Sequence, residues 1–180
     1  MKNIGIYLIL ILLITSCKKD FEINITPKKI SEKKFKTIIK TNFPENTIFS
    51  ITVERLYQRK NNPNIYGGTH FFSREFPVKN GEIEFSFEVN DKEWIKYYNE
   101  HREDDKRNEF PNKELTEIDF KFIKDSLEIS VFYNPIFERD ENVKKIIGEN
   151  GKNLSGKGTI ELENEKIFRI TKSIYSKFEK

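Results

Sequence analysis

Hydrophobic and polar side chains alternate along much of the chain, and residues 82–89 show this pattern most clearly. Ile83, Phe85, Phe87 and Val89 alternate there with glutamate and serine, which is the period of a β-strand with one buried and one solvated face. The same criterion predicts several further strands. They are residues 35–41, 48–57, 71–79, 118–123, 127–133, 159–162 and 167–171.

The dipeptide Asn80-Gly81 separates two of these strands. Both residues adopt positive φ at low cost, as the central positions of a tight β-turn require. We therefore expect residues 71–79 and 82–89 to form a β-hairpin. Pro77 lacks an N–H group to donate, so its strand is expected at an edge or beside a bulge.

The period changes from two to that of an α-helix after residue 90. Asn90 and Glu93 have the spacing of a capping box, which predicts a helix over residues 90–102. One face of this helix carries aromatic and imidazole side chains, namely Trp94, Tyr97, Tyr98 and His101. The charged residues 102–111 are expected to form a solvated loop, and residues 143–147 a short helix that ends at Gly148.

Short strands joined by turns, with a helix between two of them, predict a mainly β fold. Uneven turn spacing favours a single antiparallel, immunoglobulin-like β-sandwich over a barrel, with one helical insertion near residues 90–102. The chain has one cysteine, so this sandwich would lack the disulfide of many immunoglobulin domains. We assign residues 32–180 to this domain.

Residues 1–16 have the organisation of a secretory signal peptide. Lys2 is followed by a run without charged side chains from Ile4 to Ile14 and then by Thr15 and Ser16. The apolar run is shorter than the roughly 20 residues that a membrane-spanning helix needs. The segment is therefore expected to be removed.

The sequence Ile14-Thr15-Ser16-Cys17 resembles a bacterial lipobox, in which lipid is attached to the cysteine after cleavage in front of it. The resemblance implies a lipoprotein held on a membrane through Cys17, with acyl chains that anchor it firmly. Residues 18–22 resemble a surface-export signal of Gram-negative lipoproteins, which implies the outer membrane, on its periplasmic or surface face. Residues 17–31 are lysine-rich and would form a tether, with an edge strand at residues 21–25 as the alternative.

Composition argues against a nucleic-acid partner. Cleavage leaves 164 of the 180 residues, and loss of Lys2 lowers the formal net charge from +3 to +2, with both signs interspersed. Residues 143–154 resemble the core of a KH domain through Gly148-x-x-Gly151, and a similar Ile-Gly-x-x-Gly stretch resembles uncharacterised sandwich proteins of the bacterial envelope. We favour a loop of the sandwich over a KH domain for three reasons: the chain is expected to be exported, further glycines follow soon after Gly151, and the loop contains the acidic Glu149.

The stripe formed by Trp94, Tyr97, Tyr98 and His101 is the one candidate ligand platform. Amphipathic aromatic side chains can stack on sugar rings, although a helix beside a sandwich must also bury one face, which favours packing. His70 and His101 lack the spacing of zinc ligands. The acidic run 103–105 lacks the pattern of a calcium loop. We assign no catalytic residue, cofactor or metal.

These observations lead to three hypotheses for the domain. The first is a non-catalytic envelope lipoprotein that binds a protein or a glycan. The second is an enzyme that acts on envelope glycans, since 29 acidic residues offer many carboxylate pairs. The third is a lipoprotein inhibitor or immunity protein, for which size and location are permissive.

Overall fold

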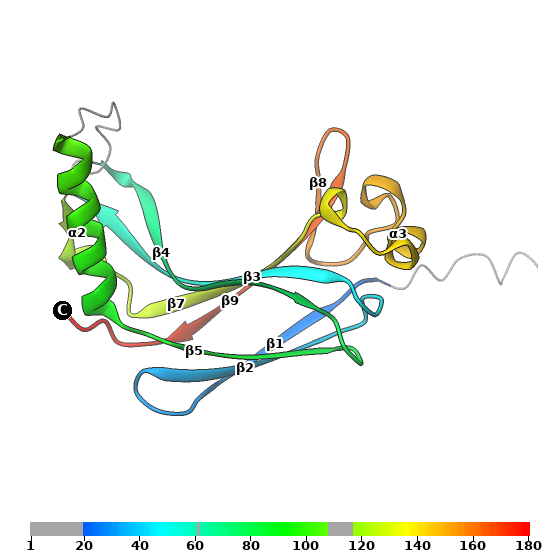
Figure 1. Ribbon diagram of the computed structural model, residues 1–180, viewed down its shortest axis with the longest axis horizontal. Coiled ribbons are helices and arrows are strands. Elements are labelled where there is room, and N and C mark those ends of the chain that lie inside the picture. Colours follow the sequence, from blue (N-terminus) through cyan, green and yellow to red (C-terminus); the bar gives the residue numbers. More distant parts are fainter. Residues whose placement is uncertain (1–19, 61, 108–116) are drawn as a thin grey trace, which may run out of the picture.

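A computed structural model of the chain describes residues 20–60, 62–107 and 117–180 and has two antiparallel sheets (Figure 1). The first sheet has the order β1-β2-β5, with β1 (Ile23–Lys29), β2 (Lys34–Thr41) and β5 (Glu82–Glu88). The second has the order β4-β3-β7-β9-β8, with β3 (Ile48–Arg59), β4 (Asn62–Pro77), β7 (Ser126–Tyr133), β8 (Thr159–Glu161) and β9 (Lys166–Tyr175). The short β6 (Ile118–Asp119) pairs with the end of β3. The mainly β prediction is confirmed.

The inward faces of both sheets form one hydrophobic core. Ile83, Phe85 and Phe87 of β5 are buried while the glutamate and serine residues between them are solvated or partly so, as the alternation predicts. We call the shared interior the main core. Its fully buried members include Ile39, Phe49, Ile51, Val53, Leu127, Ile129, Val131 and Tyr133.

The predicted hairpin between β4 and β5 is wrong, although its turn is correct. Asn80 and Gly81 have φ values of 52° and 71°, and the N–H groups of Lys79 and Glu82 donate to each other's carbonyls at 3.1 and 3.0 Å. Beyond this single bridge the strands separate, because β4 pairs with β3 in one sheet and β5 with β2 in the other. The turn therefore carries the chain from one layer to the next.

Residues 23–29 form strand β1 at the edge of the first sheet, so the predicted tether is wrong for this stretch and the alternative of an edge strand over residues 21–25 is confirmed from Ile23 onward. Its seven residues pair in register with β2, from Ile23 opposite Thr41 to Lys29 opposite Phe35. Ile25 is buried in the main core. Lysine and proline are common on edge strands because they discourage further pairing, so an edge strand can resemble a linker in sequence.

The first of the two predicted helices begins where its capping box predicts. Helix α2 (Asp91–Arg107) follows Asn90, whose side-chain oxygen accepts from the Glu93 N–H at 3.2 Å while its amide nitrogen donates to the Glu93 carboxylate at 3.0 Å. The helix continues to Arg107, so a loop beginning at residue 102 is wrong. Helix α3 (Glu141–Ile147) ends at Gly148 as expected, but it begins two residues before the predicted start, because the Asp140 side chain caps it.

Two further segments differ from their predictions. In place of the predicted strand over residues 118–123, the structure has the two-residue strand β6 and the 3₁₀ turn η1 (Phe120–Phe122). The Asp119 carboxylate accepts from the Lys121 N–H at 3.1 Å and closes this turn. Residues Glu149–Gly151 form the 3₁₀ turn η3, and turns rather than a second helix follow up to β8. The KH-like stretch therefore lacks the helix pair of that domain.

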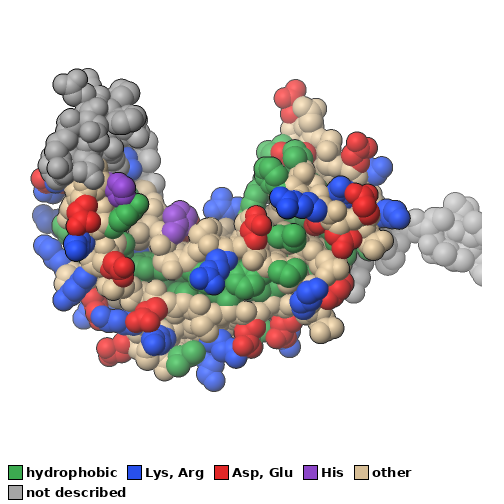
Figure 2. Space-filling model, in the orientation of Figure 1, with side chains coloured by type: hydrophobic (Ala, Val, Ile, Leu, Met, Phe, Trp, Pro, Cys, Tyr) green, Lys and Arg blue, Asp and Glu red, His purple; other side chains and the backbone are tan. Residues whose placement is uncertain are grey.

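The two helices lie at opposite ends of the sandwich (Figure 1). Helix α2 stands at one end beside the far parts of β3 and β4, whereas α3 and β8 occupy the other end, next to the 3₁₀ turn η2 (Pro135–Phe137). Figure 2 shows a hollow in the surface between these ends. Among the described residues, no helix has both the length and the hydropathy needed to cross a membrane.

Candidate functional site

A cleft of about 760 Å³ lies between α2 and the ends of β3 and β4, and we call it the α2 cleft. It brings the predicted aromatic stripe together with residues that are distant in sequence. Its lining consists of Tyr57, Gly68, Thr69, His70, Phe71, Glu88, Asn90, Glu93, Trp94, Tyr97, Tyr98 and His101. Both histidines of the chain are among them, and Figure 2 shows histidine side chains on the α2 side of the hollow.

The four stripe residues divide into a packed pair and an exposed pair. Trp94 is only 7% exposed and stacks on the Tyr57 ring with centroids 5.5 Å apart, and Tyr98 meets the same ring edge-on at 5.5 Å. Tyr97 is 63% exposed and packs edge to face against the exposed His101 ring, with the two ring centroids 4.0 Å apart. Packing therefore accounts for Trp94 and Tyr98, and the accessible aromatic surface is that of Tyr97 and His101.

Tyr57 forms the base of the cleft because a glycine lies directly beneath its ring. It points inward from β3 and pairs across the sheet with Gly67 of β4. A Cβ atom at Gly67 would lie 2.6 Å from Cζ of the Tyr57 ring, closer than side chains approach. The absence of a side chain there lets the ring lie flat against the strand and stack under Trp94.

A buried ion pair fixes the first turn of α2 to β3. Arg55 is fully buried, and its Nε and Nη2 donate to the two oxygens of Asp91 at 2.8 and 3.1 Å. Its remaining N–H groups donate to the Lys124 carbonyl at 2.8 Å and to the carbonyl and hydroxyl of Ser176 at 2.7 and 3.3 Å. All five donors of the guanidinium therefore have acceptors.

Asp91 connects this ion pair to the cleft. Its Oδ1 also accepts from the indole Nε1 of Trp94 at 3.0 Å, and its Oδ2 accepts from the Glu179 N–H at 3.0 Å. The Arg55 guanidinium lies over the rings of Phe71 and Phe178, 5.9 and 5.8 Å from their centroids. The orientation of Trp94 is thus set by directional hydrogen bonds.

The polar groups of the cleft can donate and accept hydrogen bonds beside the aromatic surfaces. Burial, together with the nearby Tyr57, raises the pKa of Tyr98 above its ordinary value, so its hydroxyl is protonated at neutral pH. Glu88 and Glu93 contribute carboxylates, and Asn90 holds the Glu93 carboxylate in place. This combination of flat apolar area and polar edges suits a ligand that offers both.

Metal binding finds no support in the described part of the chain. No group of three or more histidine, cysteine, aspartate or glutamate side chains converges there. The side chains of the acidic run 103–105 lie outside the described residues, as do the predicted signal peptide and Cys17. The geometry singles out no catalytic residue.

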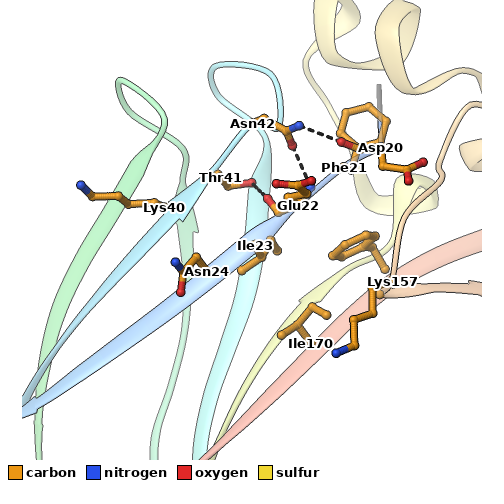
Figure 3. Close-up of a pocket in the computed structure, with 12 residues that line it drawn as sticks. Asp20, Phe21, Glu22, Ile23, Asn24, Lys40, Thr41, Asn42, Lys157 and Ile170 are labelled. Carbon is orange, nitrogen blue, oxygen red and sulfur yellow. Dashed lines mark hydrogen bonds between the residues drawn. The ribbon is translucent and has the colours of Figure 1, made fainter. Parts of the chain in front are cut away.

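A second cleft, of about 580 Å³, lies where the described chain begins (Figure 3). Asn42 spans the first residues there, donating to the Asp20 carbonyl and accepting from the Glu22 N–H, both at 2.8 Å. The Thr41 hydroxyl donates to the Glu22 carbonyl at 2.7 Å. These contacts make the entry segment part of the folded domain.

Sequence reasoning found the helical part of the α2 cleft and missed the residues that β3 and β4 supply. The burial of Arg55 could have been predicted, because Arg55 continues the alternation that places Ile51, Val53 and Tyr57 on the buried face of the same strand. No comparable pattern in the sequence marked His70 and Phe71 as cleft residues.

Comparison of the chain with protein-family models, curated proteins and solved structures finds no match.

Proposed function

We propose that this chain is a lipid-anchored protein of the bacterial envelope whose β-sandwich is a non-catalytic binding domain with its ligand site in the α2 cleft. The lipobox-like sequence before Cys17 supports the anchor, and residues 18–22 favour the outer membrane. The observation that carries the binding role is the cleft itself, where Tyr97 and His101 stay exposed beside a tightly packed aromatic base.

The strand order supports the immunoglobulin-like part of the proposal. In that fold strands A, B and E form one sheet and strands C and F with G form the other, with C′ beside C. The orders β1-β2-β5 and β4-β3-β7-β9 correspond to A-B-E and C′-C-F-G. Domains of this architecture commonly serve in recognition, although a shared fold alone does not fix a ligand.

The cleft chemistry favours an envelope glycan over an extended apolar peptide. Sugar rings present apolar faces that stack on tyrosine and hydroxyl edges that bond to carboxylates, amides and imidazoles. Tyr97 offers the first kind of surface, and Glu88, Glu93 and His70 offer the second. A protein that presents similar groups is the alternative ligand.

Binding to a panel of envelope glycans and envelope proteins tests the proposal, with Trp94 as the reporter. It is the single tryptophan of the chain and lines the cleft, so its fluorescence should change when a ligand binds. Replacing Tyr97 by alanine should weaken binding by about 1–2 kcal/mol, which corresponds to a rise in Kd of roughly 5- to 30-fold.

The matched control is Tyr175→Ala. Tyr175 is 69% exposed, close to the 63% of Tyr97, but lies on β9 away from the cleft. Equal losses in both variants, or a ligand whose binding neither variant changes, would refute the assignment of the cleft.

An enzyme acting on envelope glycans is the second candidate, because two carboxylates line the same cleft. Glycoside hydrolysis uses a pair of such groups. Turnover of an envelope glycan that is lost in Glu88→Gln and Glu93→Gln would favour this function over binding alone. The inhibitor or immunity hypothesis has no residue of its own among the described positions.

A further inference from the structure

The outer face of the second sheet carries a row of hydroxyl side chains. Thr52 of β3 lies between the buried Ile51 and Val53, so its side chain points away from the main core. Residues directly opposite one another in neighbouring strands point to the same face of a sheet. The register therefore extends the outward position of Thr52 into a row across four strands, which consists of Ser73, Thr52, Ser130 and Thr171.

Two further rows flank this hydroxyl row on the same face, and we call the three rows together the sheet floor. Neighbouring strands lie about 4.8 Å apart, so each row spans about 14 Å. The row nearer to α3 consists of Glu75, Ser50, Phe132 and Arg169. The row nearer to α2 consists of His70, Glu54, Glu128 and Ser173.

The sheet floor is the base of a trough. In Figure 1 the sheet β1-β2-β5 lies below the second sheet, whereas α2 at one end and α3 with β8 at the other rise above it. The outer face of the second sheet therefore forms the bottom of the hollow shown in Figure 2. Because the strands run from one end to the other, this hollow crosses them in the direction of the rows, and we call it the sheet trough.

Both walls of the sheet trough present exposed rings. At the α3 end a small pocket of about 170 Å³ is lined by floor residues that include Ser50 and Glu75, and by Phe137 of η2, which is 72% exposed. At the α2 end His70 belongs both to the sheet floor and to the lining of the α2 cleft. The cleft, with its exposed Tyr97, is thus continuous with the trough.

The groups of the sheet floor and the small pocket suit a ligand rich in hydroxyls and free of acidic groups. Their four carboxylates and two guanidiniums give a formal charge of −2, which disfavours nucleic acid and acidic polysaccharides. The floor has one hydrophobic side chain, Phe132, whereas the centre of a protein interface is depleted of charge and rich in aromatic groups. Its hydroxyls can both donate to and accept from those of a sugar. The charged residues are Glu54, Glu75, Glu128, Glu138, Arg139 and Arg169.

We propose that the ligand of the α2 cleft is a neutral polysaccharide whose chain extends from the cleft into the sheet trough and lies across the hydroxyl row. This inference rests on the proposed glycan-binding function and adds a part of the site that the cleft does not provide. Tyr97 in one wall and Phe137 in the other offer flat apolar area to sugar rings, and the floor between them offers hydrogen-bonding groups. Longer oligosaccharides therefore bind more tightly than those that fill the cleft alone.

Calorimetric titration of the full-length chain with neutral oligosaccharides tests the trough. The probes are the disaccharides and hexasaccharides of the cello-, malto- and chito-oligosaccharide series. In the series that binds, the hexasaccharide should have a Kd at least about tenfold below that of the disaccharide. Replacing Thr52 and Thr171 together by valine removes two floor hydroxyls at nearly constant volume. The Kd of the hexasaccharide should then rise by roughly tenfold, and that of the disaccharide should not change.

Matched controls distinguish the trough from the rest of the surface. Thr26→Val removes an exposed hydroxyl from β1, in the other sheet, and should leave both Kd values unchanged. Phe137→Ala should raise the Kd of the hexasaccharide severalfold. Phe122→Ala should not, because this ring is 53% exposed but lines neither the α2 cleft nor the small pocket.

The outcomes separate the trough from the proposed function. Disaccharide binding that Tyr97→Ala weakens, with a Kd that depends neither on chain length nor on Thr52 and Thr171, overturns the trough alone. Hexasaccharide binding that needs the two threonines but not Tyr97 supports the trough and overturns the assignment of the cleft. Absence of binding in all three series, or tighter binding of an oligolysine peptide or an oligogalacturonate, overturns the neutral glycan at both places.

Discussion

The main core and the base of α2 are both almost free of solvent, but they are stabilised by different kinds of contact. The main core consists of aliphatic and aromatic side chains, with rings such as Phe43 and Phe49 packed edge to face at 4.9 Å. The base of α2 is a smaller cluster around Tyr57, Trp94 and Ile118, built beside the buried Arg55–Asp91 ion pair.

The two kinds of contact restrict the structure to different degrees. Apolar packing depends on volume and tolerates swaps between side chains of similar size. A buried guanidinium with five acceptors tolerates only one placement of α2, because any shift leaves donors unpaired. The main core thus stabilises the fold through well-packed volume, and the ion pair determines where the wall of the α2 cleft stands.

The strongest test of the comparison is Asp91→Ala. Removing one partner leaves Arg55 charged and buried, so the free energy of unfolding should fall by about 3–5 kcal/mol. Because Asp91 also holds the Trp94 indole, the tryptophan emission of the folded variant should shift to longer wavelength. Urea unfolding followed by fluorescence measures both effects.

The matched variant in the main core is Leu127→Ala, at a fully buried position. The substitution should lower the free energy of unfolding by a similar amount, about 2–5 kcal/mol, because it leaves a cavity in the core. Its folded state should keep the wild-type emission of Trp94. An emission shift in Leu127→Ala, or none in Asp91→Ala, would show that the two regions are not independent in the way described.

Gly67→Ala should produce an intermediate effect that is confined to the cleft. The new methyl group would displace the Tyr57 ring and loosen its stack with Trp94, at a cost of about 1–3 kcal/mol. Near-ultraviolet circular dichroism should report the change in aromatic packing. Gly68→Ala is the control, because the two atoms nearest to a Cβ there are at the end of the flexible Glu54 side chain, which can move away. A larger effect in this control would argue against the role of Gly67.

The smallest expected effect concerns the N-terminus of α3. Backbone N–H groups of Asn142 and Val143 donate to the Asp140 carboxylate and lower its pKa below the ordinary value of 3.8. Since the folded state has the lower pKa, the carboxylate stabilises the fold above pH 3.8, and this contribution is lost as pH falls through the lowered value.

Asp140→Ala should therefore lower the melting temperature at neutral pH, and the gap to the wild type should close in acid. The melting temperature as a function of pH measures this effect. A gap that is constant with pH would indicate that the carboxylate charge does not contribute.

Local patterns along the chain predicted most elements, but not their partners. The alternation in β5 and the capping residues Asn90 and Glu93 depend on neighbours in sequence, and the structure has both as expected. The Asn80–Gly81 turn also formed. Whether its flanking strands then pair depends on competing partners, and β3 offered β4 a much longer ladder than β5 could.

The candidate site was predictable only on its helical side. Aromatic spacing located Trp94 and Tyr97, but the division into buried and exposed members depends on Tyr57, 37 positions before Trp94. Burial of Arg55 contradicts the usual behaviour of arginine and is explained by acceptors from three other segments. Such constellations arise from the fold and leave little trace in local sequence.

The Arg55 contacts also constrain the order in which the chain can complete its fold. Two of its acceptors belong to Ser176, which is separated from Arg55 by 121 positions. Until the segment around Ser176 arrives, the guanidinium has no acceptors there and α2 cannot settle in its final place. Contacts of such large sequence separation form late and slow the search for the native state. The α2 cleft should accordingly mature only when strand β9 and the residue that follows it, Ser176, have taken their places in the second sheet.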